Sequence, residues 1–220
     1  TDIIHANIML YDIFCFDENS LVMGGSNEGS IFRSSDGGNT WNSVPKVIYR
    51  TILDIVRLDG TTALACSEVG LIIKTTDKGA NWTKKTSGSN SYLYALSCPD
   101  GNTVYACGQS GTILKSSDGG ENWTKQTSGT TNTLYGISFW DANNGIAVGY
   151  SGTILRTTDG GAVWTTVTSS AYRTLYSVIH LNADTTILTG NSSMYFSSNG
   201  GANWTEKKMT EGLGILNKLV

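Results

Sequence analysis

Short apolar runs alternate with polar and glycine-rich segments along the whole chain. Each run holds about five residues, many of them β-branched, aromatic or aliphatic, which is typical of β-strands. Turn-forming Gly, Asp, Asn and Ser stand between the runs, so consecutive strands are expected to pair as hairpins. The clearest set of four runs is Leu93–Cys98, Thr103–Cys107, Thr112–Ser116 and Trp123–Thr127.

This set of four returns at a fixed period. The octet Ser116–Trp123 follows the third run, and versions of it place tryptophans at intervals of 41, 41, 41 and 40 residues. A period of this size that holds four short strands is typical of a β-propeller blade. We therefore predict an all-β fold, a β-propeller of four-stranded antiparallel blades, with residues 1–220 forming one domain. The predicted blades span about 10–47, 52–88, 93–129, 134–170 and 175–209.

The octet has the composition of a tight turn. An aspartate can accept main-chain N–H groups, and the glycines that follow it adopt a positive φ without strain. The tryptophan then begins the fourth strand and covers the turn with its ring. Because every blade needs such a turn, we predict a structural role, with no catalysis and no metal binding, for Asp36, Asp77, Asp118, Asp159, Asn199, Trp41, Trp82, Trp123, Trp164 and Trp204.

The octet pattern Ser/Thr-x-Asp-x-Gly-x-x-Trp is similar to the Asp-box, or BNR repeat, of sialidases, sortilin-type receptors and xyloglucanases. The phrases Gly129–Phe139 and Gly149–Gly161 look most like the bacterial propellers grouped with photosystem II assembly and stability factors. This resemblance covers nearly the whole chain. It implies a non-catalytic, extracytoplasmic binding or scaffolding propeller. Those factors present an arginine-bearing face to a protein client, which maps here only onto Arg50 and Arg173.

The composition and charge of the chain limit the classes of partner that we expect. The net charge is -3 and only 15% of the residues are charged, so no basic field favours nucleic acid. No apolar run is long enough to cross a bilayer, and the first residues lack the basic and apolar segments of a signal peptide. A polar surface rich in Ser, Thr, Asn and Gly is typical of secreted proteins, and we expect an extracytoplasmic location.

The four cysteines form neither a disulfide framework nor a metal-binding spacing. We predict buried free thiols at Cys15, Cys66, Cys98 and Cys107, and no metal or cofactor. A basic residue ends four of the five third strands. We expect its stem to cover the outer surface of the blade while its charge stays in water.

Ligand binding is expected on the loops that precede each first strand and on those that join second to third strands, which meet at one face of a propeller. The triplets Tyr49–Thr51 and Tyr172–Thr174 hold the same repeat position three blades apart. Tyrosine and arginine together suit a carboxylate, a sugar or a peptide, although repeat duplication explains the likeness equally well. The candidate residues are Tyr49, Arg50, Tyr172, Arg173, Glu28, Glu68, Gln109 and Tyr150.

Asp12 and Asp54 share one position on adjacent first strands, near the expected channel. Two carboxylates there could act as the acid and base of a glycoside hydrolase. A channel lined by small polar groups explains them as well, and nothing else in the sequence completes an active site. We therefore favour a non-enzymatic protein or carbohydrate binder, with a sialidase-like hydrolase as the alternative.

The two ends of the chain leave two arrangements open. Residues 213–220 lie where a sixth first strand would begin. Either five blades close a ring, or the chain is part of a larger propeller whose spare strand pairs elsewhere. The second arrangement adds a further alternative, a structural subunit that forms homo-oligomers through its terminal strands.

Overall fold

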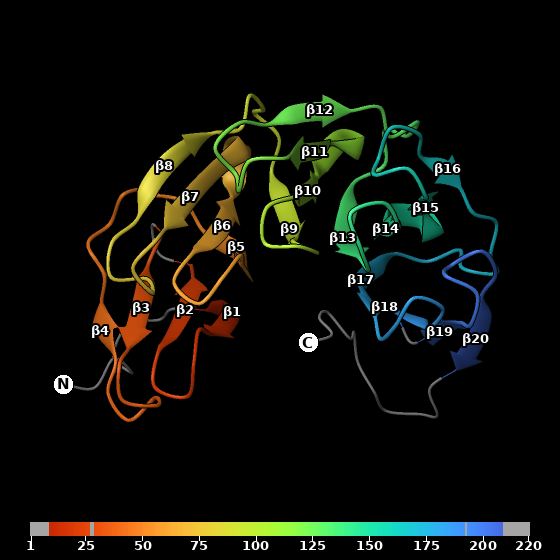
Figure 1. Ribbon diagram of the computed structural model, residues 1–220. Coiled ribbons are helices and arrows are strands. Elements are labelled where there is room, and N and C mark those ends of the chain that lie inside the picture. Colours follow the sequence, from red (N-terminus) through yellow and green to blue (C-terminus); the bar gives the residue numbers. More distant parts are fainter. Residues whose placement is uncertain (1–8, 27–28, 192, 209–220) are drawn as a thin grey trace.

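The computed structural model describes residues 9–26, 29–191 and 193–208. It confirms the all-β prediction, because these residues form five four-stranded antiparallel sheets, arranged as an arc of blades (Figure 1). Within each sheet the strands follow chain order, and the first strands lie nearest the centre of the arc. Among the described residues, no helix has the length and apolar character that a bilayer crossing requires.

The strands have the following bounds. Blade 1 consists of β1 (Leu10–Cys15), β2 (Leu21–Gly25), β3 (Ile31–Ser34) and β4 (Asn42–Ser43). Blade 2 consists of β5 (Ile52–Arg57), β6 (Ala63–Ser67), β7 (Leu71–Thr75) and β8 (Thr83–Thr86). Blade 3 consists of β9 (Leu93–Ser97), β10 (Val104–Gly108), β11 (Ile113–Ser116) and β12 (Thr124–Gln126).

Blade 4 consists of β13 (Leu134–Phe139), β14 (Gly145–Gly149), β15 (Ile154–Thr157) and β16 (Thr165–Thr166). Blade 5 consists of β17 (Leu175–His180), β18 (Thr186–Gly190), β19 (Ser193–Ser197) and β20 (Thr205–Lys208). Short 3-10 turns join second to third strands in the middle blades, at η2 (Glu68–Gly70), η3 (Gln109–Gly111) and η4 (Tyr150–Gly152). The predicted segment 213–220 lies outside the described residues.

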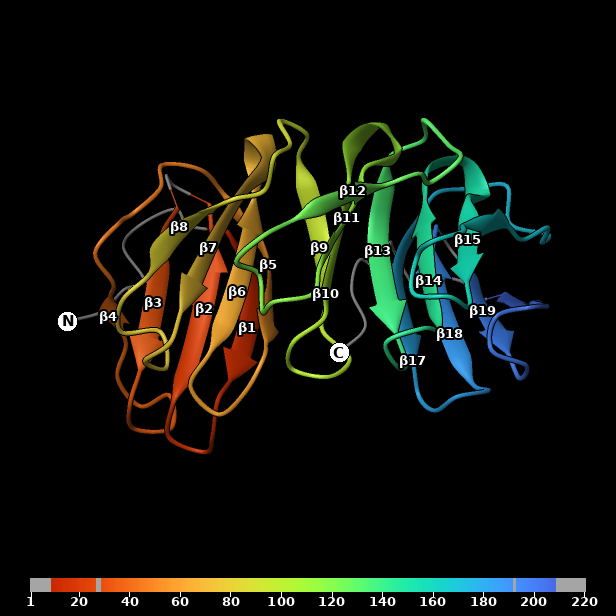
Figure 2. The same cartoon turned by 45° about the horizontal axis from the view of Figure 1, so that its top comes forward.

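The apolar core lies between blades. Every residue of β6, β10 and β14 is buried, as expected for a strand covered on both faces by neighbouring sheets. Ile52 and Ile55 of blade 2 pack against Val22 and Ile31 of blade 1, and equivalent clusters lie between each later pair of blades. Figure 2 shows the sheets side by side along the arc. Each blade is therefore stabilised mainly by its neighbours.

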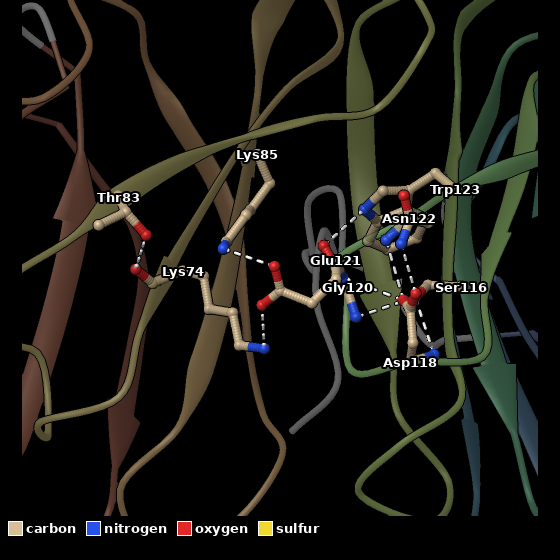
Figure 3. Close-up of polar contacts among 9 residues, drawn as sticks. All are labelled: Lys74, Thr83, Lys85, Ser116, Asp118, Gly120, Glu121, Asn122 and Trp123. Carbon is tan, nitrogen blue, oxygen red and sulfur yellow. Dashed lines mark hydrogen bonds and ion pairs between the residues drawn. The ribbon is translucent and has the colours of Figure 1, made fainter.

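The Asp-box turn is held by its own polar groups (Figure 3). Asp118 accepts hydrogen bonds from the Ser116 hydroxyl at 2.8 Å and from the main-chain N–H of Asn122 at 2.9 Å. The Trp123 indole donates to the Gly120 carbonyl at 3.1 Å. Asp36, Asp77 and Asp159 bond within their own turns in the same way, and so does the amide oxygen of Asn199, as the structural prediction requires.

The second glycine of the turn fits against the preceding blade. Gly120 has a φ of 84°, and a Cβ atom there would come within 2.5 Å of the Leu64 side chain on β6. Gly79 faces Val22 and Gly201 faces Ile146 in the same manner. A side chain at this position would therefore strain the backbone and separate two blades.

The basic residue at the end of the third strand also joins two blades, which corrects our expectation that it covers the outer surface. Lys74 pairs with Glu121 of the next Asp-box at 2.8 Å, and Lys85 contacts the other carboxylate oxygen at 2.7 Å (Figure 3). Lys115 and Arg156 donate to glycine carbonyls of the next turn, Gly160 and Gly200. The charged end of this side chain therefore contacts the Asp-box turn of the next blade.

All four cysteines are free thiols. Cys66 and Cys107 are buried, as predicted, and Cys98 is half-buried. The prediction is wrong for Cys15, which is exposed because it lies at the end of β1, on the side of blade 1 that faces away from blade 2.

Replacing Gly120 by alanine tests the contact between blades. We expect Gly120→Ala to lower the free energy of unfolding by about 2–4 kcal/mol, from the positive φ together with overpacking against Leu64. The matched control is Gly129→Ala, which also has a positive φ, 75°, but no atom within 4 Å of the added Cβ. Its loss should be only about 1–2 kcal/mol. Equal losses for both variants in urea denaturation would show that the blade contact contributes nothing.

The Asp-box also predicts a pH dependence. Hydrogen bonds from Asn122 hold the pKa of Asp118 at about 2 in the folded protein. Because this lies below the unfolded value near 4, the contribution of the carboxylate is complete above about pH 4 and is lost as the pH falls towards 2. Asp118→Asn should flatten the stability profile in this range, whereas Asn199→Asp should steepen it. Thermal unfolding across the range would contradict this if the profiles of both variants matched the wild type.

Candidate binding channel

The first strands of the five blades line a cavity of about 610 Å³ at the centre of the arc. Its wall comes from equivalent positions in each blade, so the repeat sets its chemistry. Among the described residues, no lysine, arginine or histidine lines it, and its surface is mainly apolar with a few polar groups. The residues that line it include Tyr11, Asp12, Leu53, Asp54, Tyr94, Ala95, Tyr135, Gly136, Tyr176 and Ser177.

A row of tyrosines forms one side of this cavity. The ring centroids of Tyr94 and Tyr135 lie 5.2 Å apart, and those of Tyr135 and Tyr176 lie 5.6 Å apart, with the rings tilted by 50° and 46°. These spacings are those of favourable aromatic pairs. Burial, with a smaller effect of neighbouring tyrosines, raises the pKa of Tyr94 and Tyr135, so both hydroxyls stay protonated at neutral pH. We call Tyr94, Tyr135 and Tyr176 the tyrosine row.

The local backbone explains why these rings reach the channel. The pairing of β13 with β14 skips one residue between Leu134 and Gly136, and that of β17 with β18 skips one between Leu175 and Ser177. Such a bulge sets two residues of one strand against one of its partner and re-aims the extra side chain. The extra residue is Tyr135 or Tyr176, so its aliphatic neighbour stays in the core while the ring faces the cavity.

The two channel carboxylates join neighbouring blades. Asp12 Oδ2 accepts the main-chain N–H of Ile55 at 2.8 Å, and Asp54 Oδ2 accepts that of Leu96 at 2.7 Å. Both residues are more than nine-tenths buried. Later blades use hydroxyls two positions further on, where Ser97 accepts the N–H of Phe139 at 2.9 Å. The carboxylates predicted at the channel thus lie there, with one oxygen of each bonded to the next first strand.

The predicted loop residues lie at one end of the channel. Ser67 of the β6–η2 junction donates to the Thr51 carbonyl, and the N–H of Gln109 donates to Tyr92 O, so both classes of loop meet as predicted. The Asp-box turns instead bond to the turns between first and second strands, as Gly119 does to Asn102. These bonds place the loops and the Asp-boxes on opposite faces.

The two Tyr–Arg pairs are exposed on that loop face. Tyr49 is 66% exposed and Tyr172 is 72% exposed, and Arg173 lies over the Tyr172 ring at 5.5 Å. The pairs precede β5 and β17, which stand on opposite sides of the channel (Figure 1). The structure therefore does not bring the four residues together into one cluster.

The remaining loop candidates start the 3-10 turns. Glu68 is half-buried, whereas Gln109 and Tyr150 are exposed. The next residue in each turn has a positive φ, 50° for Val69 and 56° for Ser110, which side chains rarely adopt. Glu28 lies outside the described residues.

The tyrosine row is the feature that sequence reasoning missed. Its signal was present, because tyrosine follows the first aliphatic residue of four first strands, at Tyr11, Tyr94, Tyr135 and Tyr176. A strand in which successive side chains strictly alternate between the two faces of the sheet gives no sign that a bulge turns this residue towards the channel. Among the described residues, no group of His, Cys, Asp and Glu side chains is arranged to hold a metal ion.

Comparisons with known proteins agree with this architecture. A family model described as photosynthesis system II assembly factor YCF48 matches residues 126–215, which include blades 4 and 5. The structure of YCF48 bound to D1 peptide has a TM-score of 0.53 and 14% identity, over 92% of this chain and 81% of that chain. YCF48 from Cyanidioschyzon merolae has a TM-score of 0.51 and 15% identity, over 96% and 88%.

A glycoside hydrolase has the same fold. The GH74 enzyme of Niastella koreensis has a TM-score of 0.73 and 18% identity, over 95% of this chain but only 42% of that chain. No curated protein matches the sequence. The fold is therefore that of a β-propeller, and residues 126–215 are similar to the photosystem II assembly factor family.

Asp54 provides a test of the polar link between blades. Asp54→Ala removes the acceptor of the buried Leu96 N–H, and we expect a loss of about 1–3 kcal/mol in the free energy of unfolding. Asp54→Asn keeps an oxygen acceptor and should lose about half of that or less. Chemical denaturation of both variants measures the difference, and two equal losses would contradict a role for the hydrogen bond.

Proposed function

We propose that this protein is a non-catalytic binding or scaffolding propeller that recognises a segment of a partner protein at its loop face and channel. The observation that carries the proposal is the tyrosine row, whose half-buried rings line a cavity of about 610 Å³. Tyrosines that keep both an apolar face and a hydroxyl available are enriched at recognition surfaces. A carbohydrate that stacks on the same rings is the second ligand class.

The surroundings of the cavity support a largely uncharged ligand segment. The described part of its lining holds no cationic side chain, and the two carboxylates each have an oxygen bonded to the next blade. Cationic side chains that could pair with a charged group of the ligand lie instead at the rim of the channel, where Arg173 and Arg50 are exposed. A peptide with apolar or aromatic side chains and a nearby carboxylate fits this distribution of charge.

The state of the carboxylates also supports a role without catalysis. A glycosidase needs one carboxyl group to protonate the leaving oxygen and another to act as base or nucleophile. Here Asp12 and Asp54 use Oδ2 to accept main-chain N–H groups inside the wall. The related YCF48 structure contains a bound D1 peptide, which supports a polypeptide as the ligand class. The extracytoplasmic location is part of the proposal and is supported by the low share of charged residues, 15%.

Binding can be tested with a phage-displayed library of random dodecapeptides, from which ligands are selected on the immobilised protein. We expect Tyr135→Ala to weaken a selected peptide by about tenfold or more, and Arg173→Ala to weaken it less, because the arginine lies at the rim. Calorimetry measures both effects. Trp140→Ala is the matched control, since Trp140 is also an exposed aromatic residue, 44% exposed, but precedes a turn on the Asp-box side.

Two results would contradict the proposal. One is an equal loss of peptide affinity in Trp140→Ala, which would mean that selection found general aromatic stickiness. The other is hydrolysis of xyloglucan or a sialoside by the wild type that Asp54→Asn abolishes, which would make the protein an enzyme.

A further inference from the structure

In blades 2 and 3 the second strand donates a side-chain hydrogen bond to the blade that follows it. In blade 2 the Cys66 thiol donates to the Leu93 carbonyl at 3.2 Å, and in blade 3 the Cys107 thiol donates to the Leu134 carbonyl at 3.7 Å. Both acceptors are the first residue of the next first strand. In blades 2 and 3 the fourth residue of the second strand therefore donates a hydrogen bond to the first residue of the following blade.

Blade 5 has a surface with a hydrogen-bond donor at the same position. Thr189 is the fourth residue of β18, is fully buried, and its hydroxyl has no hydrogen-bond partner among the described residues. A buried donor left without an acceptor costs free energy, so a carbonyl is expected opposite it. We call this surface the outgoing face of blade 5, and its half-buried apolar members are Ile179, Ile187, Met194 and Phe196.

The repeat specifies which residue fits that face. The residue eleven positions after each Asp-box tryptophan is Ile52, Leu93, Leu134 or Leu175, and each is at most 1% exposed against the preceding blade. Eleven positions after Trp204 stands Ile215. Ile215–Asn217 repeats Ile52–Asp54 with asparagine in place of aspartate, although the likeness stops at Lys218, where the other first strands carry an aliphatic residue.

The segment that precedes Ile215 has the same length as a linker between two described blades. Six residues, 87–92, separate the end of β8 from the start of β9. Six residues, 209–214, separate the end of β20 from Ile215. The chain can therefore reach the outgoing face of blade 5 with the same linker that joins blades 2 and 3.

We propose that residues 215–217 dock on the outgoing face of blade 5 as the start of a sixth first strand. Ile215 fills the apolar surface beside Ile187, and its carbonyl accepts the hydrogen bond of Thr189. Leu216 then occupies the position of Tyr135 and Tyr176 and faces the channel, because the bulge turns this position away from the core. The arrangement extends the wall of the cavity by one strand.

Thiol accessibility in the full chain tests this docking. Cys15 and Cys98 are first replaced by serine to remove the accessible native thiols. Cys66 and Cys107 can stay, because they are buried and unreactive. In that background Ile215→Cys should react with a maleimide about tenfold or more slowly than Leu216→Cys, because residue 215 is covered and residue 216 faces the channel. In denaturant the two rates should become equal.

A second substitution on the face itself checks the site. Ile187→Asp should raise the rate of the residue 215 thiol to that of the residue 216 thiol, with the circular dichroism spectrum unchanged. Equal native rates for the two thiols would overturn the proposal. Protection that disappears on dilution, with a dimer seen by light scattering, would also overturn it, since the strand would then belong to a second copy.

Discussion

The contact between consecutive blades is the constraint on which the rest of the structure depends. A four-stranded blade cannot bury both faces of its own second strand, so β6, β10 and β14 need a sheet on either side. The Asp-box serves this contact as much as its own turn. Its second glycine, such as Gly120, admits Leu64 of the preceding blade, and its main-chain oxygens receive basic side chains such as Arg156. One motif thus closes a hairpin and aligns two sheets.

The same contact determines what faces the channel. Polar side chains on the first strands form hydrogen bonds with the next blade. Asp12 accepts the main-chain N–H of Ile55, and Asp54 accepts that of Leu96. Aliphatic residues on the other side of these strands are drawn into the core. The bulged residue takes part in neither, and its side chain is free to line the cavity. The tyrosine row is therefore a consequence of how the blades are joined, and its three rings stand on the first strands of blades 3, 4 and 5.

Much of the fold could be predicted from the sequence, because it follows from local chemistry that repeats. Trp123 and its equivalents fix the period, and the Asp-Gly-Gly turn fixes where the third strand ends. The roles of Lys74 and Asp54 could not be predicted in this way, since both act on residues about 40 positions away in the next blade. The sequence of one strand does not distinguish a charged side chain that is exposed to water from one that contacts the turn of a neighbouring blade. The channel position of Tyr135 depends on a register shift that residue alternation does not reveal.

Stability is not uniform along the arc, and this bears on the site. Leu10 and Ile13 of β1 are both 55% exposed, whereas the equivalent Leu134 and Ile137 of blade 4 are at most 5% exposed. Burying such a side chain contributes about 1.5–3 kcal/mol, so a blade covered on one side only is held less firmly than one covered on both. Blades 3 and 4 have neighbours on both sides in Figure 1, and they carry two of the three members of the tyrosine row, one of them Tyr135. Tyr94 and Tyr135 therefore stand on blades that are covered on both sides, where local opening costs most, whereas Tyr176 stands on blade 5.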